Sequence, residues 1–206
     1  MIKQVLFTIS GFVPLLFLIS GDTTLLIYSL FVLIYFLRSK ISPLIQSIPI
    51  PTPLLLFFLI FGLGIISEWL VWLSVHLSGN PDPEINPNLF LHLKSIYGFY
   101  VVKAISWTVI LQFFRFSLLQ VFITQSIFGI FIEQQGRVLL QALANPAGLI
   151  WLPYVALVYS SYVTAAFVLV EGKLNMLPKW DHWVKYPLIW LLIFLLLVLA
   201  TLLFGG

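Results

Sequence analysis

Long apolar stretches constrain this chain more than any other feature. The stretch from Tyr186 to Phe204 is almost wholly Leu, Ile, Val and Phe, and a helix needs about 20 mainly apolar residues to cross a bilayer. Of the 206 residues 61% are apolar and 8% are charged, whereas soluble domains contain about 45–50% apolar and about 25% charged residues. The sequence therefore predicts an all-α, polytopic transmembrane helix bundle, with residues 1–206 forming a single integral membrane domain.

The composition also excludes several chemical classes. The net charge of +3 comes from ten scattered Lys and Arg residues, which form no basic patch and argue against a nucleic-acid partner. Cysteine is absent, so thiolate metal sites, iron–sulfur clusters and cysteine nucleophiles are excluded. His76, His92 and His182 lack the short spacing that is typical of zinc ligands. We therefore predict no metal site, no catalytic residue and no cofactor.

Turn-forming residues divide the chain into apolar segments. Ser20-Gly21-Asp22-Thr23 ends one segment and starts the next, which predicts a helical hairpin that either crosses the membrane or re-enters it. Four prolines between residues 42 and 53 exclude a continuous helix there. With short loops between them, the six predicted spans are residues 4–20, 24–37, 54–77, 104–132, 149–170 and 186–204.

The length of the fourth span depends on whether residues 94–133 form one helix. Residues 94–133 contain no proline, which predicts one helix longer than the membrane is thick, with residues 94–103 as an interfacial lead-in. A break at Arg115 is the alternative. In the six-span arrangement the loops after spans one, three and five share one side, and both termini share the other. Lys and Arg near the span ends are almost equally divided; because Lys3, Arg38 and Lys40 flank the early helices, we predict cytoplasmic termini.

Ionisable residues inside apolar spans are costly, and Glu68 and Arg115 are the two that lie deep. At about 1.5 Å per residue they lie roughly 14 and 17 Å from the same side of the membrane, which predicts a buried Glu68–Arg115 ion pair. Gln112 shares a helix face with Arg115, and Ser160 and Ser161 reach the same layer. This midplane polar cluster either fixes helix packing through hydrogen bonds or binds a polar solute or lipid headgroup.

Glu133 and Arg137 form a second charged pair near the end of the predicted fourth helix. Residues four apart lie on the same face of a helix. The spacing predicts an interfacial ion pair.

Three function classes follow from these features. A non-catalytic subunit or assembly factor of a membrane complex is the main prediction, because the loops are short and no complete catalytic motif is present; its partners are the lipid bilayer and other membrane subunits. The first alternative is a small transporter or lipid-handling protein with a site at Glu68 and Arg115. The second is an intramembrane enzyme, which requires His76, His92 and His182 to converge.

Overall fold

The computed structural model describes residues 2–79, 82–145, 148–149, 151–174 and 180–204. These residues form helices and loops without a strand, so the all-α helix bundle is confirmed. In chain order the elements are α1 (Ile2–Ser10), α2 (Pro14–Phe17), the 3₁₀ turn η1 (Leu18–Ser20), α3 (Leu26–Gln46), α4 (Thr52–Ser78), α5 (Leu89–Phe113), α6 (Leu118–Phe128), the π-helical turn η2 (Gly129–Glu133), α7 (Arg137–Ala144), α8 (Trp151–Leu174) and α9 (Lys185–Phe204).

Five of these helices are long and apolar enough to cross a membrane by length and composition, namely α3, α4, α5, α8 and α9. Two shorter apolar segments accompany them, Gln4–Ser20 and Leu118–Ile132. The first of these is divided at Gly11, where a Cβ atom would lie 2.7 Å from Cγ1 of Val32 on α3. The helical part of this segment is therefore shorter than the predicted span of residues 4–20.

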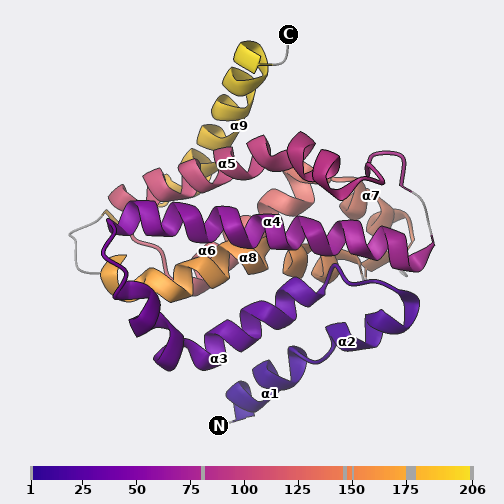
Figure 1. Ribbon diagram of the computed structural model, residues 1–206, viewed down its shortest axis with the longest axis horizontal. Helices are drawn as coiled ribbons and strands as arrows, with labels where there is room; N and C mark the ends of the chain where they lie inside the picture. The colour runs from indigo at the N-terminus through magenta and orange to yellow at the C-terminus, as the bar shows by residue number, and fades with distance from the viewer. Residues whose placement is uncertain (1, 80–81, 146–147, 150, 175–179, 205–206) are drawn as a thin grey trace.

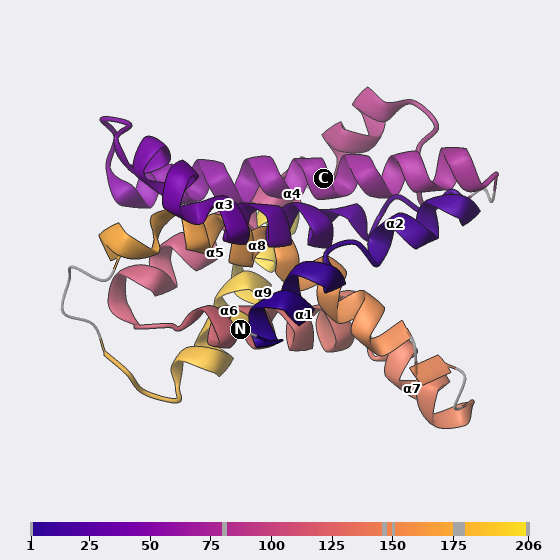
Figure 2. The ribbon, with the colours of Figure 1, turned by 90° about the horizontal axis from the view of Figure 1, so that it is seen from below.

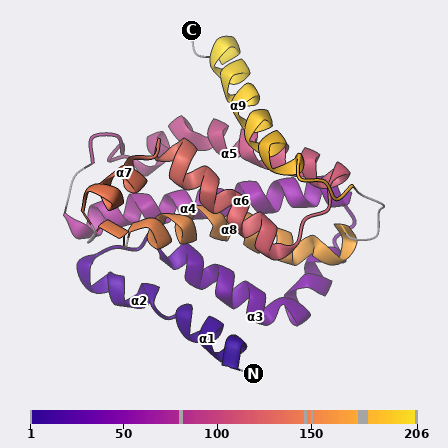
Figure 3. The same cartoon turned by 180° about the vertical axis from the view of Figure 1, so that it is seen from behind.

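Helix α8 is the centre of the bundle and packs against α3, α4 and α6 (Figures 1 and 3). Every residue from Ser160 to Val170 is buried. Small and β-branched side chains predominate in this stretch, which lets the neighbouring backbones approach closely. Helix α9, by contrast, packs mainly against α5 and projects away from the other helices (Figures 1 and 3).

The predicted single helix over residues 94–133 is wrong. Helix α5 ends at Phe113 and α6 begins at Leu118, and the hydroxyl of Ser117 and the side chain of Gln120 form a capping box at the start of α6. The backbone N–H of Arg115 donates to the carbonyl oxygen of Trp180 at 2.8 Å. These contacts satisfy backbone groups that a helix break leaves open. The break at Arg115 is therefore the correct alternative.

Because of this break, the chain reverses direction once more than the six-span arrangement predicts. Helices α8 and α9 therefore begin at the opposite ends of the bundle from those predicted. We call the end holding residues 21–25, 79 and 82–88 the Asp22 end, and the end holding residues 47–51, 114–117 and 180–184 the Lys185 end (Figures 1 and 2). Tyr154, at the start of α8, donates to Asp22, whereas Leu169, near its other end, accepts from Gln46 of α3. Glu171, Asp181 and His182 therefore do not share an end with Asp22, contrary to the six-span prediction.

Two predicted boundaries also change because helices extend beyond their apolar runs. Helix α3 continues through Pro43 to Gln46 and α4 begins at Thr52, so only residues 47–51 of the proline-rich connector are non-helical. Helix α5 begins at Leu89, where the side chain of Asn88 accepts from the backbone N–H of Leu91 and caps the helix. The predicted interfacial segment of residues 94–103 is thus interior to α5, and its last residue, Lys103, is fully buried.

Candidate functional site

The side chain of Glu68, on α4, lies in a buried polar cluster between α4 and α5. It is 7% exposed. Its Oε1 lies 2.6 Å from Nε2 of His92, and its Oε2 accepts a hydrogen bond from the hydroxyl of Tyr100 at 2.8 Å. Both oxygens of the carboxylate are therefore bound to side chains of one neighbouring helix.

The start of α5 decides this geometry. Because the helix begins at Leu89, His92 is in its first turn and Tyr100 lies about two turns further along the same face. The ring of Tyr100 packs against Gly64 of α4, and only glycine leaves room for it, because a Cβ atom at this position would lie 2.3 Å from Cδ1 of the ring. The close approach of α4 and α5 at Gly64 thus brings the tyrosine hydroxyl to Glu68.

A cavity of about 360 Å³ lies against this cluster. Glu68, His92 and Tyr100 form part of its wall, together with side chains of α8, while the exposed Asp82 and Glu84 line it from the loop at the Asp22 end. We call this cavity the polar chamber; its full lining is Thr24, Ser67, Glu68, Val71, Asp82, Glu84, Ile85, His92, Ile96, Phe99, Tyr100, Gln134, Tyr154, Val155, Val158, Tyr159 and Tyr162.

The imidazole of His92 is only half satisfied. An ionised Glu68 can only accept, so Nε2 of His92 carries the hydrogen that joins the pair. Nδ1 is buried and has no hydrogen-bond partner among the described residues. A buried polar atom without a partner is costly, and this one belongs to a residue that lines the polar chamber. Nδ1 is therefore a buried polar atom whose hydrogen-bonding capacity is unused among the described residues.

Lys103 continues the same face of α5 and is fully buried behind the chamber. Its Nζ lies 4.9 Å from the ring centroids of Phe99 and Tyr162 and 5.0 Å from that of Phe128. The ring of Tyr162 in turn meets that of Tyr100 edge to face at 5.8 Å. Aromatic faces attract an ammonium group electrostatically, so rings of the chamber wall also help to hold this buried cation.

Arg115 lies in a different part of the molecule from Glu68. It is in the break between α5 and α6 at the Lys185 end, where it lines a pocket of about 210 Å³ with Glu171 and Asp181. The carboxylate of Glu68 is bound by α5 instead. The predicted Glu68–Arg115 ion pair is therefore wrong, because it assumed a continuous helix that would have placed Arg115 at membrane depth.

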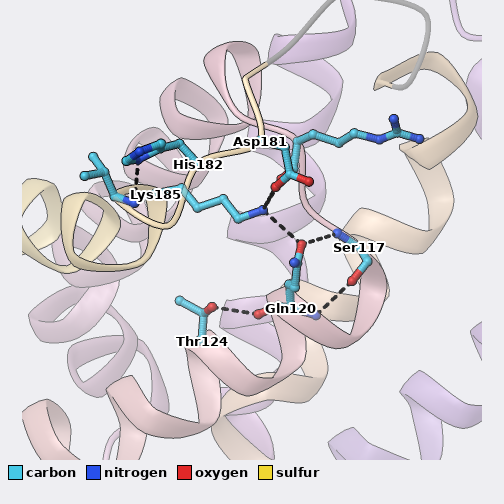
Figure 4. A network of polar contacts seen from close by, with 8 residues as sticks. Ser117, Gln120, Thr124, Asp181, His182 and Lys185 are labelled. Atoms are coloured by element: carbon cyan, nitrogen blue, oxygen red, sulfur yellow. Dashed lines mark hydrogen bonds and ion pairs between the residues drawn. The ribbon is translucent and has the colours of Figure 1, made fainter.

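A second buried lysine organises the Lys185 end (Figure 4). Nζ of Lys185 donates to the carbonyl oxygen of Arg115 at 2.6 Å, to Oδ1 of Asp181 at 2.7 Å and to Oε1 of Gln120 at 3.1 Å. The hydrogen bond and the positive charge of Lys185 lower the pKa of the Asp181 carboxyl below its ordinary value. The ammonium therefore ties the start of α9 to the break between α5 and α6.

The other members of the predicted midplane cluster bond within their own helices. The side chain of Gln112 donates to the carbonyl oxygen of Thr108, and the hydroxyls of Ser160 and Ser161 donate to carbonyl oxygens one turn earlier in α8. None of the three is in the lining of the polar chamber. Their arrangement favours the interpretation of a polar seam within the packed helices.

The predicted Glu133–Arg137 pair is described only in part. Arg137 is exposed and donates to the side chain of Gln135 at 3.1 Å, whereas the side chain of Glu133 lies outside the described residues. The ion pair stays a prediction.

The three histidines do not converge. His76 stacks on Trp72 with ring centroids 3.8 Å apart, His92 binds Glu68, and His182 lies beside Trp183 at the Lys185 end. Within the described part of the chain no group of three His, Cys, Asp or Glu residues could hold a metal ion. The histidine convergence that the enzyme alternative requires is thus not found.

Sequence reasoning missed His92, Tyr100 and Lys103 as neighbours of the site. The signal was present, because Asn88 is a favourable N-cap residue, and a helix beginning after it places these three residues on one face.

Comparisons with protein-family models, with curated proteins and with solved structures found no match to this chain.

Proposed function

We propose that the chain is a multi-pass integral membrane protein that binds a small organic cation in the polar chamber and exchanges it for a proton. The observation that carries this proposal is the 2.6 Å contact between Glu68 and His92 in the wall of a cavity of about 360 Å³. A carboxylate in an apolar helix is costly and therefore a candidate functional group. Helix α4, which carries it, is long and apolar enough to cross a membrane.

The lining of the polar chamber favours a cation. Carboxylates of Glu68, Asp82 and Glu84 line it, and His92 is the one basic residue in its described lining. A cleft lined by one sign of charge concentrates counter-ions. Aromatic rings of Phe99, Tyr100 and other residues complete the wall, and such rings attract alkylammonium groups. The class of solute that fits is a small amine in its protonated form.

Exchange with a proton follows from the shared carboxylate. When His92 carries a proton on both ring nitrogens, its charge compensates Glu68 and the pair is neutral. When Nδ1 loses its proton, the pair is left with one negative charge, which a bound cation can compensate instead. Proton and cation therefore compete for the same compensation, so the binding of one lowers the affinity for the other.

The experiment measures cation binding and proton release together. Ethylammonium is added to the full-length protein in detergent and weak buffer at several starting pH values, while a pH dye records proton release and calorimetry records binding. We expect release of close to one proton per bound cation. His92→Gln should still bind ethylammonium but release no proton, and Glu68→Gln should lose both signals.

Glu171→Gln is the matched control, because this carboxylate lies outside the polar chamber and should leave both signals unchanged. Absence of binding to the wild type, or unchanged proton release in Glu68→Gln, contradicts the proposal. Uptake of ethylammonium into proteoliposomes against a pH gradient then tests transport itself.

A second candidate function is that of a subunit in a membrane complex, and the observation that favours it is the position of α9. This helix projects from the bundle (Figure 3), and its outward side chains include Phe194 at 58% and Leu202 at 78% exposure. Mild-detergent purification with mass spectrometry tests this function: partner proteins that depend on α9 are expected, and Phe194→Ala should release them.

A further inference from the structure

We propose that a lateral groove between α1, α3 and α6 binds one acyl chain of an anionic phospholipid. The groove has a volume of about 360 Å³ and is separate from the polar chamber, with which it shares no lining residue. This inference rests on the proposed function only in requiring that the chain lies in a bilayer. The groove is lined chiefly by Phe7, Tyr28, Phe31, Tyr35, Leu119 and Phe122.

The wall of the groove is a set of aromatic rings from three helices. The ring of Phe31 meets those of Phe7 at 5.9 Å and Phe122 at 6.1 Å, and Phe7 meets Tyr35 at 5.0 Å. Rings fixed by mutual contact keep a preformed apolar surface, and preformed apolar clefts are the usual form of sites for apolar ligands.

Two polar groups of the lining are already bound within the protein. The hydroxyl of Tyr28 lies 2.6 Å from Oγ of Ser10, and the hydroxyl of Thr164 donates to the carbonyl oxygen of Ser160 at 2.6 Å. A ligand that enters the groove therefore need not supply hydrogen bonds to these two groups, which favours a hydrocarbon chain over a polar solute.

The charge at one end of the groove favours an anionic headgroup. Tyr28, Phe31, Tyr35 and Arg38 follow one another at helical spacing along the same face of α3. The guanidinium of the exposed Arg38 lies 3.9 Å from the ring centroid of Tyr35, so it lies next to the groove. Guanidinium groups bind phosphate oxygens in a bidentate manner. The lipid phosphate is therefore assigned to Arg38 and one of its chains to the groove.

The test uses native mass spectrometry of the full-length protein taken from vesicles containing equal amounts of phosphatidylglycerol and phosphatidylcholine of the same chain length. We expect the wild type to retain one phosphatidylglycerol through detergent washing. Leu119→Trp, which fills the groove from an exposed position, should lower retention about tenfold, which corresponds to about 1.4 kcal/mol of binding free energy. Arg38→Gln should retain lipid but lose most of the preference for phosphatidylglycerol.

Leu140→Trp and Arg137→Gln are the matched controls. Leu140 is as exposed as Leu119, at 65% each. Arg137 and Leu140 both lie on α7, away from the groove, so neither control variant should change retention. Equal retention of both lipids by the wild type, or equal behaviour of Leu119→Trp and Leu140→Trp, overturns the assignment. A second protein chain retained in place of lipid, and lost in Leu119→Trp, overturns it as well. Recovery of the protein outside the membrane fraction would instead refute the membrane proposal on which this inference rests.

Discussion

Nε2 of His92 lies 2.6 Å from Oε1 of Glu68, although 24 residues separate the two in the sequence. The two helices that carry them run antiparallel and are joined by the loop at the Asp22 end (Figure 1). Each group is less than 10% exposed, so each needs the other to offset the loss of water. This mutual dependence makes the geometry around the pair a sensitive target for substitution.

Gly64→Ala should destabilise the contact between α4 and α5. The new methyl group would lie 2.3 Å from Cδ1 of Tyr100, which forces the ring away from Glu68 and costs about 1–3 kcal/mol in the manner of an overpacked core. Thermal unfolding in detergent measures the effect. Gly62→Ala is the control, because nothing lies within 4 Å of a Cβ atom there; equal stability of the two variants would show that the tyrosine moves without cost.

Tyr100→Phe should leave Oε2 of Glu68 without its tyrosine donor. A hydrogen bond to a charged group contributes about 1.5–3 kcal/mol, so we expect a loss of this size in the free energy of unfolding. Tyr97→Phe serves for comparison, since Tyr97 is 53% exposed on the same helix and should change stability little. A loss no greater than that of Tyr97→Phe contradicts the role assigned to the hydroxyl.

Ser117→Ala should weaken the start of α6. The substitution removes the hydroxyl that accepts from the backbone N–H of Gln120, and the loss of an N-cap residue costs about 1 kcal/mol. Ser47→Ala, in the exposed turn between α3 and α4, provides a control at the same Lys185 end of the bundle. Denaturant titration followed by far-UV circular dichroism measures both; a Ser117→Ala curve that matches the wild type would contradict the capping role.

The Asp181–Lys185 contact should make stability depend on pH in acid. Because Lys185 lowers the pKa of Asp181 from 3.8 in the folded protein, the contribution of the contact is fully present above pH 3.8 and declines as the pH falls through the lowered folded value. Asp181→Asn should therefore be less stable than the wild type at neutral pH, with a difference that shrinks below pH 3.8. Thermal unfolding over this range tests it, and a difference that grows in acid would have the wrong sign.

The sequence by itself determined the class of fold. Long apolar stretches can satisfy their backbone groups in an apolar environment only as helices or closed barrels, and the described chain is a helix bundle. It also singled out Glu68, since a carboxylate inside an apolar segment is conspicuous without any structure. These features depend on composition and on local pattern.

The tertiary structure decided which residue Glu68 binds. The four residues from Phe114 to Ser117 turn the chain between α5 and α6, and this turn places Arg115 at the Lys185 end. Whether such a segment breaks a helix depends on partners remote in sequence, here the carbonyl oxygen of Trp180 and the ammonium of Lys185, which lies 70 residues beyond Arg115. A depth calculated from the rise per residue of a single helix does not include those contacts. The pairing of Glu68 with His92 is therefore visible only in the packed arrangement of the helices.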